Sequence, residues 1–256
     1  MSLPTCTVIV ATYNCESTLA DCLNSIVSQT VKSELIVIDG GSTDSTNSII
    51  KNYEDNLSYY ISEKDQGVYD AWNKALKKAT GEWIIFLGSD DWFDSNTSLY
   101  TALSCAEKTY GEKELLIYPT VHLIDEKKKV IGVDNDEWEK VKRKFPANMP
   151  LTHSGTLHNN IIFKKYGFFD ENFRIAGDYE LFSRIFQDGV TAKFCKEYII
   201  QMSTGGLSNA PKQRVRLLSE QLMVINRYGL KLSFQQLLWK KVKKFLYRTI
   251  SMIKTK

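Results

Sequence analysis

Two adjacent carboxylates, Asp90 and Asp91, follow the apolar run at residues 83–87, with only Gly88 and Ser89 between. A run that is apolar on both faces is typical of a strand in the middle of a parallel sheet covered by helices. In such sheets the ligand crevice lies just beyond the carboxyl ends of the strands. Paired oxygen ligands there suit a divalent cation that bridges protein and phosphate. The two residues are also common in turns and helix caps, so a plain surface turn stays open.

Polar residues also follow the three earlier predicted strands. They are Thr12, Tyr13 and Asn14 after residues 5–11, Asp39 and Asp44 at and after residues 34–39, and Asp65 and Gly67 after residues 57–62. A tyrosine that stacks a base and carboxylates that accept from base or ribose donors are the groups that a nucleotide cleft needs. Neither a Walker-type lysine loop nor Gly-x-Gly-x-x-Gly follows the first strand, which disfavours kinase-like phosphate binding and dinucleotide binding.

The elements that must position these residues alternate along the first hundred positions. Helical spacing of apolar residues at 19–27 and 68–79 separates the four predicted strands, the last of which covers residues 82–87. This alternation predicts an α/β fold with a mostly parallel central sheet flanked by helices. Later segments are less regular. We expect strands at 115–124, 156–163, 191–195 and 198–202, and helices at 134–144 and 179–187.

The charge distribution divides the chain into an acidic body and a basic tail. All 30 acidic residues lie at or before Glu220, and nine of the 33 Lys and Arg residues follow it, so residues 1–220 carry a net charge of −6. A length of 256 residues fits one α/β domain with an appendage. We predict a catalytic domain at 1–210 and a basic amphipathic helical extension at 211–256.

The five cysteines are odd in number, scattered and without a Cys-x-x-Cys pair. This pattern argues against a disulfide framework or a zinc site and favours a reducing compartment. No secretory signal precedes the first strand, and no apolar run approaches ~20 residues. These features predict a cytoplasmic body.

The tail has membrane-binding character. Between residues 237 and 253, Trp239, Phe245 and other apolar residues recur at helical spacing, and lysines and arginines fill the remaining positions. Such a helix suits the interface of an anionic membrane. The alternative is a helix packed on the catalytic domain. Nucleic-acid binding is disfavoured because the apolar stripe is continuous and the body is acidic.

The order of these motifs resembles family 2 glycosyltransferases of the GT-A fold. The resemblance covers about residues 4–210, with matching blocks at 8–14, 37–44, 65–73, 87–91, 153–155, 166–171, 176–181 and 205–208. The chain looks most like bacterial enzymes that extend lipid-linked oligosaccharides for capsule, O-antigen or exopolysaccharide. The resemblance implies a hexosyl- or N-acetylhexosaminyltransferase with a nucleotide-diphosphate sugar donor and a polyprenyl-diphosphate-linked glycan acceptor. Such an enzyme would work as a peripheral protein at the inner face of the cell membrane.

The resemblance also implies roles for the residues of the donor site. Asp91 ends an Asp-x-Asp-type motif and would bind Mg²⁺ or Mn²⁺ on the nucleotide diphosphate, while Asp90 would contact the ribose or donor sugar. Tyr13 and Asp39 would bound the base pocket, with Asp65 nearby. Many relatives have a second acid after the strand-two aspartate, and here that residue is Gly40, so the nucleotide stays open.

Asp178 matches the catalytic base of the family. On its own it would more often be the N-cap of the helix expected from Tyr179. A single carboxylate that takes the proton of an acceptor hydroxyl implies one displacement, with inversion at the anomeric carbon. Glu180 is the second candidate for the base.

Further donor-site candidates follow from the same blocks. Thr12, Asn14 and Gly67 belong to the predicted cleft. Asp70 and Asn73 share a helix face with two lysines, so a solvated surface is their alternative role. His153 would contact the diphosphate or an acceptor hydroxyl, or serve as a structural residue. Gly205 and Gly206 would form a loop that closes over the nucleotide, or a simple turn.

Two other functions stay open at this stage. One is a non-catalytic nucleotide-sugar-binding homologue, against which the intact set of Asp90, Asp91 and Asp178 argues. The other is a sugar nucleotidyltransferase. Such enzymes usually carry an N-terminal Gly-rich phosphate loop with Arg or Lys, and residues 11–15 do not form one.

Overall fold

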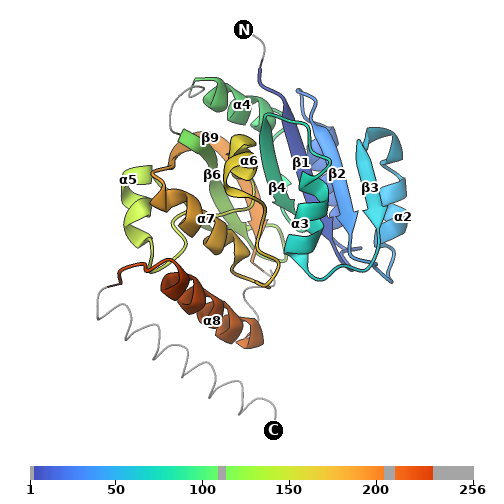
Figure 1. Cartoon of the computed structure of the whole chain (residues 1–256). Helices are drawn as coiled ribbons and strands as arrows, with labels where there is room; N and C mark the ends of the chain where they lie inside the picture. Colours follow the sequence, from blue (N-terminus) through green and yellow to red (C-terminus); the bar gives the residue numbers. More distant parts are fainter. Residues whose placement is uncertain (1–2, 109–113, 205–210, 233–256) are drawn as a thin grey trace.

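The computed structural model describes residues 3–108, 114–204 and 211–232. Over these residues one nine-stranded sheet has the order β3-β2-β1-β4-β8-β6-β9-β5, and β7 pairs with β6 (Figure 1). The strands are β1 (Cys6–Thr12), β2 (Glu34–Asp39), β3 (Tyr59–Ser62), β4 (Trp83–Gly88), β5 (Trp92–Phe93), β6 (Glu114–Ile124), β7 (Val130–Asp134), β8 (Leu157–Asn159) and β9 (Thr191–Ser203).

The first four strands confirm the predicted parallel arrangement. β1 pairs in parallel with both β2 and β4, and β2 pairs in parallel with β3. The register sets Thr12 beside Asp39, and Ala11 beside Gly88. The loops that carry the candidate residues therefore leave the sheet at one common edge.

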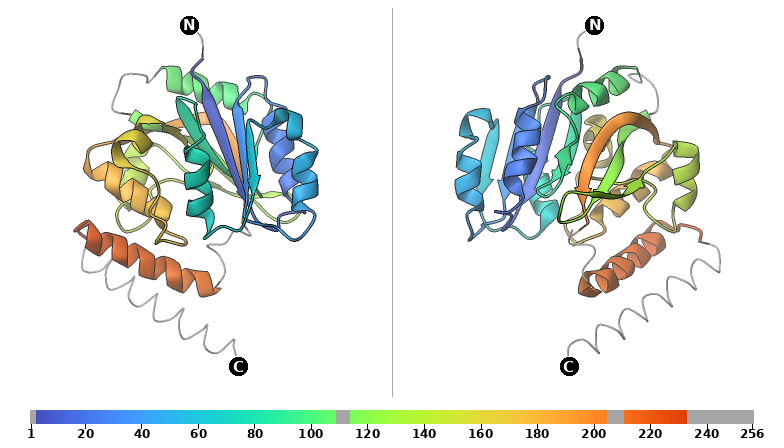
Figure 2. Two further views of the ribbon diagram at one scale, coloured as in Figure 1. Left: turned by 45° about the vertical axis from the view of Figure 1, so that its right-hand side comes forward. Right: turned by 180° about the vertical axis from the view of Figure 1, so that it is seen from behind.

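Helices cover both faces of the sheet. They are α1 (Leu19–Val27), α2 (Thr46–Lys51), α3 (Val68–Leu76), α4 (Ser98–Glu107), α5 (Trp138–Val141), α6 (Ile161–Tyr166), α7 (Gly177–Gln187) and α8 (Pro211–Arg227). Residues of α3, α6, α7 and α8 join one buried cluster with Ile9 and Phe86, on the face seen in Figure 1. Residues of α1, α2 and α4 pack with Val8 and Ile85 on the opposite face, seen from behind in Figure 2. Because β1 and β4 are buried on both faces, their continuous apolar runs need no polar alternation.

The irregular second half differs from the sequence expectation in three places. The helix expected at 134–144 is reduced to α5 and a 3₁₀ turn (Lys142–Lys144), and Asp134 ends strand β7. The strand expected at 156–163 stops at Asn159, because the apolar residues from Ile161 form α6. The two short strands expected at 191–202 are one strand, β9, whose pairing with β6 shifts register between Pro119 and Thr120.

The structure also corrects the disulfide prediction. Cys105 of α4 and Cys195 of β9 form a disulfide. The two residues are 90 positions apart, so their spacing carries no signal, and only the packing of α4 against β9 brings them together. The cysteine argument for a reducing compartment no longer holds.

The C-terminal segment is described as far as residue 232. Helix α8 lies beneath α7 (Figures 1 and 2), and Leu218, Val224 and Ile225 are buried. The predicted membrane helix at 237–253 and the loop at Gly205 and Gly206 lie outside the described residues. Within the described ranges, the helices are all too short or too polar to cross a bilayer.

Candidate active site

A cleft of about 640 Å³ opens at the carboxyl edge of the parallel strands. Residues of the loop after β1, including Thr12, Tyr13 and Asn14, form one wall. Three other segments complete the lining, and they contribute Asp65, Gly67 and Val68, then Ser89 and Asp90, and lastly Gln213 of α8. Tyr13 is 59% exposed, which suits a platform for a planar ligand. Gln213 was not predicted from the sequence, because no motif marks it.

Two features of the cleft point to a polar ligand. The hydroxyl oxygen of Thr12 is buried and has no hydrogen-bond partner within the described residues. Asp65 accepts a hydrogen bond from the backbone N–H of Gly67 at 2.9 Å and otherwise faces the cleft. An unpaired buried hydroxyl is costly unless a ligand or water satisfies it.

Asp90 and Asp91 follow the end of β4, and the carboxylates of both lie close to Gly88. A Cβ atom built on Gly88 would be 2.6 Å from an oxygen of Asp91 and 3.1 Å from an oxygen of Asp90. Glycine is therefore required here because both carboxylates fold back over the strand end. The sequence predicted the pair of carboxylates, but not that Gly88 leaves the space in which they lie.

Asp91 is held on both carboxylate oxygens. The hydroxyl of Ser154 donates to Oδ2 at 2.6 Å, and the backbone N–H of Ser203 donates to Oδ1 at 3.0 Å. These partners come from the loop before β8 and from the end of β9. Asp91 is only 5% exposed, so its position is fixed before any ligand binds.

Both aspartates resist ionisation. Burial raises the pKa of Asp90, and burial together with the charge of Asp90 raises the pKa of Asp91. A divalent cation bound to both carboxylates would offset their mutual repulsion and their burial, so the residues fit a metal. Among the described residues, no cluster of three or more His, Cys, Asp or Glu side chains could hold a metal by itself.

Asp39 organises the loop behind the cleft. Its side chain is fully buried, and its Oδ2 atom accepts from the N–H groups of Gly41 and Ser42 at 3.1 and 3.0 Å and from the hydroxyl of Ser62 at 2.6 Å. Asn14 links the same loop to the end of β1, because its Oδ1 atom accepts from Thr43 N–H at 2.9 Å. The structure thus gives Asp39 a supporting position rather than the expected place at the pocket wall.

Asp65 fills the space beside Gly40. A Cβ atom on Gly40 would be 2.6 Å from Oδ2 of Asp65. A carboxylate therefore lies next to the position where the acid missing at residue 40 was expected, and it comes from the loop after β3. Comparison of residue 40 alone could not show that Asp65 supplies a carboxylate at this place. The two residues are brought together only by the pairing of β2 with β3.

Asp178 lies in the first turn of α7. Its Oδ1 atom accepts from the N–H of Tyr179 at 2.7 Å, and its own N–H donates to the hydroxyl of Tyr69 at 3.4 Å. Burial raises the pKa of Asp178 to about 6. Gly177 is needed beside it, because a Cβ atom there would be 2.7 Å from the ring of Tyr69. The N-cap residue of the helix is Ala176, so Asp178 is not the cap.

The fallback base, Glu180, is committed to a structural network. It is 2% exposed, pairs with Arg184 at 2.9 Å, and accepts a hydrogen bond from the hydroxyl of Tyr228. Its carboxylate holds α7 against the end of α8. This arrangement leaves Asp178 as the available carboxylate of the pair.

Asp70 and Asn73 of α3 also lie outside the cleft lining. Asp70 accepts from the N–H of Gln66 at 2.9 Å and pairs with Lys74, so it is held at the start of α3. Asn73 is buried, and its amide exchanges two hydrogen bonds with the backbone of Phe169, at 2.9 and 3.0 Å. Asn73 is thus tied to the segment before α7. The sequence placed this residue on a helix face that meets solvent or the donor, but in the structure its side chain is packed against Phe169.

His153 is buried in an aromatic cluster. Its ring stacks on Trp72 and Phe86 with centroid distances of 4.8 and 5.1 Å. Burial and the adjacent His158 hold the pKa of His153 well below its usual range, so the ring is neutral. The ring thus buttresses Ser154, the next residue, rather than meeting a diphosphate directly.

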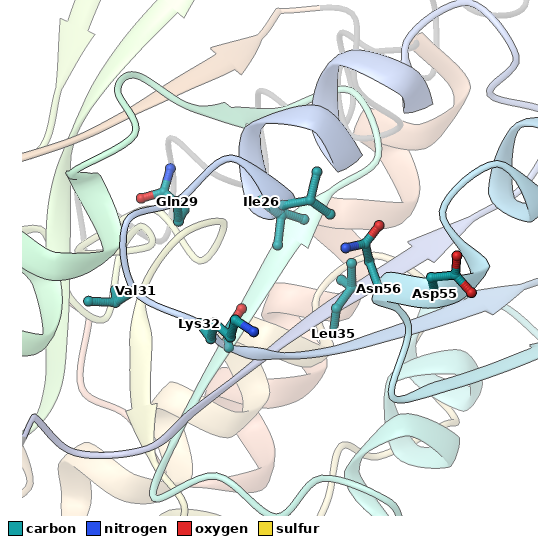
Figure 3. A pocket seen from close by; sticks show the side chains of 9 residues that line it. Ile26, Gln29, Val31, Lys32, Leu35, Asp55 and Asn56 are labelled. Atoms are coloured by element: carbon teal, nitrogen blue, oxygen red, sulfur yellow. The ribbon is translucent and has the colours of Figure 1, made fainter.

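A smaller cavity of about 210 Å³ lies at the opposite edge of the strands (Figure 3). Ile26, Val31 and Leu35 give it an apolar wall, and Lys32 and Asp55 lie at its rim. Ligands of α/β sheets bind at the carboxyl edge, and the groups suited to chemistry gather there.

The fold and the cleft define an α/β protein with a polar ligand cleft at the carboxyl edge of its parallel strands. The family model for glycosyl transferase family 2 matches residues 7–111. A PGL/p-HBAD biosynthesis glycosyltransferase of Mycobacterium tuberculosis is 30% identical over 246 residues, covering 91% of this chain and 89% of the relative. The chain therefore belongs to glycosyltransferase family 2, and it is a glycosyltransferase.

Solved structures agree on the fold. The Staphylococcus aureus protein TarS, solved in complex with UDP-GlcNAc, matches with a TM-score of 0.65 at 19% identity, over 89% of this chain and 68% of that chain. The mannosyltransferase PcManGT from Pyrobaculum calidifontis, solved with GDP-Man and Mn²⁺, gives 0.68 at 16% identity, over 91% and 66%. Both likenesses support the GT-A fold.

Proposed function

We propose that this glycosyltransferase moves a hexosyl or N-acetylhexosaminyl group, with inversion, from a nucleotide-diphosphate sugar to a glycan hydroxyl. The proposed acceptor is a polyprenyl-diphosphate-linked glycan of bacterial surface polysaccharide synthesis. The observation that carries the catalytic part is the combination of two carboxylates at the cleft end with a third, Asp178, whose pKa is raised to about 6. Asp90 and Asp91 would act on the donor diphosphate, and Asp178 would act on the acceptor hydroxyl.

The donor is proposed to lie in the cleft of about 640 Å³. Tyr13 would stack on the base, and Asp65 would accept from a base or ribose donor. The free hydroxyl of Thr12 supplies a further polar contact. The solved complexes of TarS with UDP-GlcNAc and of PcManGT with GDP-Man support a nucleotide sugar of this kind.

Asp91 and Asp90 are proposed to hold Mn²⁺ or Mg²⁺. A cation bound there would offset the negative charge that develops on the departing diphosphate. Phosphate oxygens of the donor would complete its coordination, which agrees with the lack of a third metal-ligating side chain at the pair among the described residues. PcManGT was solved with Mn²⁺, which supports this assignment.

Asp178 is proposed as the general base. The acceptor oxygen attacks the anomeric carbon while its proton passes to the Asp178 carboxylate, and the bond from the anomeric carbon to the diphosphate oxygen breaks. A carboxylate with a pKa near 6 is ionised at neutral pH and still basic enough to accept the proton. One displacement inverts the configuration of the sugar.

Membrane association is proposed through the basic amphipathic segment at 237–253. Its lysines and arginines would face anionic headgroups at the inner surface of the membrane. A lipid-linked acceptor is held at the same surface, so binding there would bring enzyme and acceptor together.

The test separates donor binding from turnover. Wild type is first screened with UDP-GlcNAc and GDP-mannose for Mn²⁺-dependent thermal stabilisation, and release of the nucleoside diphosphate is then measured. Asp178→Asn is expected to keep the thermal shift and lose turnover, whereas Asp91→Asn loses the Mn²⁺-dependent shift. Retained turnover in Asp178→Asn would place the base elsewhere. Binding without any turnover in wild type would favour a non-catalytic homologue.

A further inference from the structure

Glu220 of α8 contacts the backbone in front of helix α7. Its carboxylate accepts from the N–H groups of Arg174, Ile175 and Ala176, with its Oε2 atom 3.2, 2.9 and 2.9 Å from the three nitrogens. The side chain is only 7% exposed. A buried carboxylate is tolerated when hydrogen bonds satisfy it, and these three donors meet that condition.

The contact supplies a cap that α7 lacks in its own sequence. The N-cap residue, Ala176, has no side-chain oxygen to accept a backbone N–H. The free N–H groups at a helix start favour a negative charge beside them. Glu220 provides that charge from a helix that begins 24 residues after α7 ends.

The capped segment carries the proposed base. Asp178 is two residues beyond Ala176, so the backbone held by Glu220 sets the direction of the Asp178 side chain. The charged and titratable groups that face Asp178 are the hydroxyl of Tyr69 from α3 and the carboxylate of Glu220 from α8. Burial is the main cause of the raised pKa of Asp178, and the charge of Glu220 adds to it.

Helix α8 also reaches the donor side of the site. Gln213, two turns before Glu220, lines the cleft. One helix thus contacts both the donor cleft and the loop that positions the base. Helix α8 starts at residue 211, where the predicted C-terminal extension begins. The first part of that extension therefore takes part in forming the proposed active site.

We propose that Glu220 is a positioning residue for the general base Asp178. This inference rests on the proposed function of Asp178. Glu220 orients the first turn of α7 through three backbone hydrogen bonds and keeps the base proton-accepting near neutral pH through its negative charge. A cap that only stabilised the fold would leave the titration of Asp178 unchanged.

The experiment compares Glu220→Gln with Arg216→Gln, which removes a charge from the exposed side of the same helix. The titration of Asp178 is followed by the ¹³C carboxyl signal in protein labelled at aspartate, assigned by its loss in Asp178→Asn. Glu220→Gln is expected to move the midpoint below the wild-type value and to reduce release of nucleoside diphosphate by on the order of tenfold. Arg216→Gln is expected to match wild type in turnover.

A wild-type midpoint and wild-type turnover in Glu220→Gln would overturn the inference. If that variant does not fold, Glu220→Asp replaces it, because the shorter side chain keeps the charge but draws it away from the N–H groups. Lost turnover at an unchanged melting temperature then supports the inference, and wild-type turnover overturns it. Failure of the proposed function is distinct, because Asp178→Asn would itself stay active.

Discussion

The hydroxyl of Ser154 donates a 2.6 Å hydrogen bond to the carboxylate of Asp91, across 63 positions of the sequence. The same hydroxyl accepts from the N–H of Gly88 at 3.3 Å, so it links the end of β4 to the loop before β8. If Asp91 binds the metal as proposed, Ser154 would tune metal affinity without touching the metal.

Ser154→Ala is expected to raise the Mn²⁺ concentration for half-maximal turnover by about tenfold, because Asp91 loses one of its two fixed partners. The matched control is Ser203→Ala, which keeps the backbone N–H that bonds Asp91. Turnover is measured in a Mn²⁺ titration at saturating donor. Equal Mn²⁺ requirements in Ser154→Ala and wild type would show that the hydroxyl does not orient Asp91.

Gly88→Ala is expected to reduce Mn²⁺-dependent turnover by more than about tenfold, since its methyl group would meet Asp91 at 2.6 Å. Overpacking of this kind costs about 1–3 kcal/mol of stability as well. The control is Gly132→Ala in β7, where the nearest atom to a new Cβ would be 3.5 Å away. Both variants are compared by turnover and thermal melting, and similar losses in the two would contradict the steric argument.

Turnover is expected to rise with pH and to reach half its maximum near pH 6, because Asp178, the proposed base, must lose its proton before it can accept another. Below that pH the rate falls about tenfold per pH unit. The measurement is the rate of nucleoside diphosphate release between roughly pH 4.5 and 8, a range that spans this titration. A rate independent of pH across this range would argue against a base of this pKa.

The same titration makes a prediction about stability. The pKa of Asp178 rises from 3.8 to about 6 on folding, so ionisation opposes folding at every pH above the lower value. The cost grows as pH rises through this interval, is fully present above pH 6, and is absent below 3.8. Asp178→Asn removes it and is expected to be more stable than wild type by about 3 kcal/mol at neutral pH. Urea unfolding at acidic and neutral pH checks this, and a stability difference that does not change with pH would contradict it.

A chain that ends at Leu232 is expected to lose binding to anionic vesicles while keeping its fold. Leu230 and Leu232 pack against the hydrophobic core and would remain in place, whereas the basic amphipathic segment at 237–253 would be removed. Co-sedimentation with phosphatidylglycerol vesicles measures binding, with phosphatidylcholine vesicles and thermal melting as controls. Undiminished binding by the shortened chain would rule out the segment as the membrane anchor.

The sequence by itself determined the parallel half of the fold and its carboxyl edge. The apolar runs of β1 and β2 end in Thr12 and Asp39, and Asp90 comes two residues after the end of β4. The local pattern alone therefore predicts which end of each strand carries the polar residues. The parallel pairing of the strands then brings these ends together, independently of the conformation of the loops. Family resemblance added the role expected of Asp178, which its local sequence left ambiguous.

Only the tertiary structure decided how these residues are used. Glu220 caps a helix from another helix, Asp65 fills the space at Gly40, and Ser154 holds Asp91, each through contacts between residues far apart in the chain. Periodicity reports which face of an element is apolar, but not which partner covers it. That choice depends on how helices and strands pack, because hydrogen bonds and burial act over a few ångströms of space rather than along the sequence.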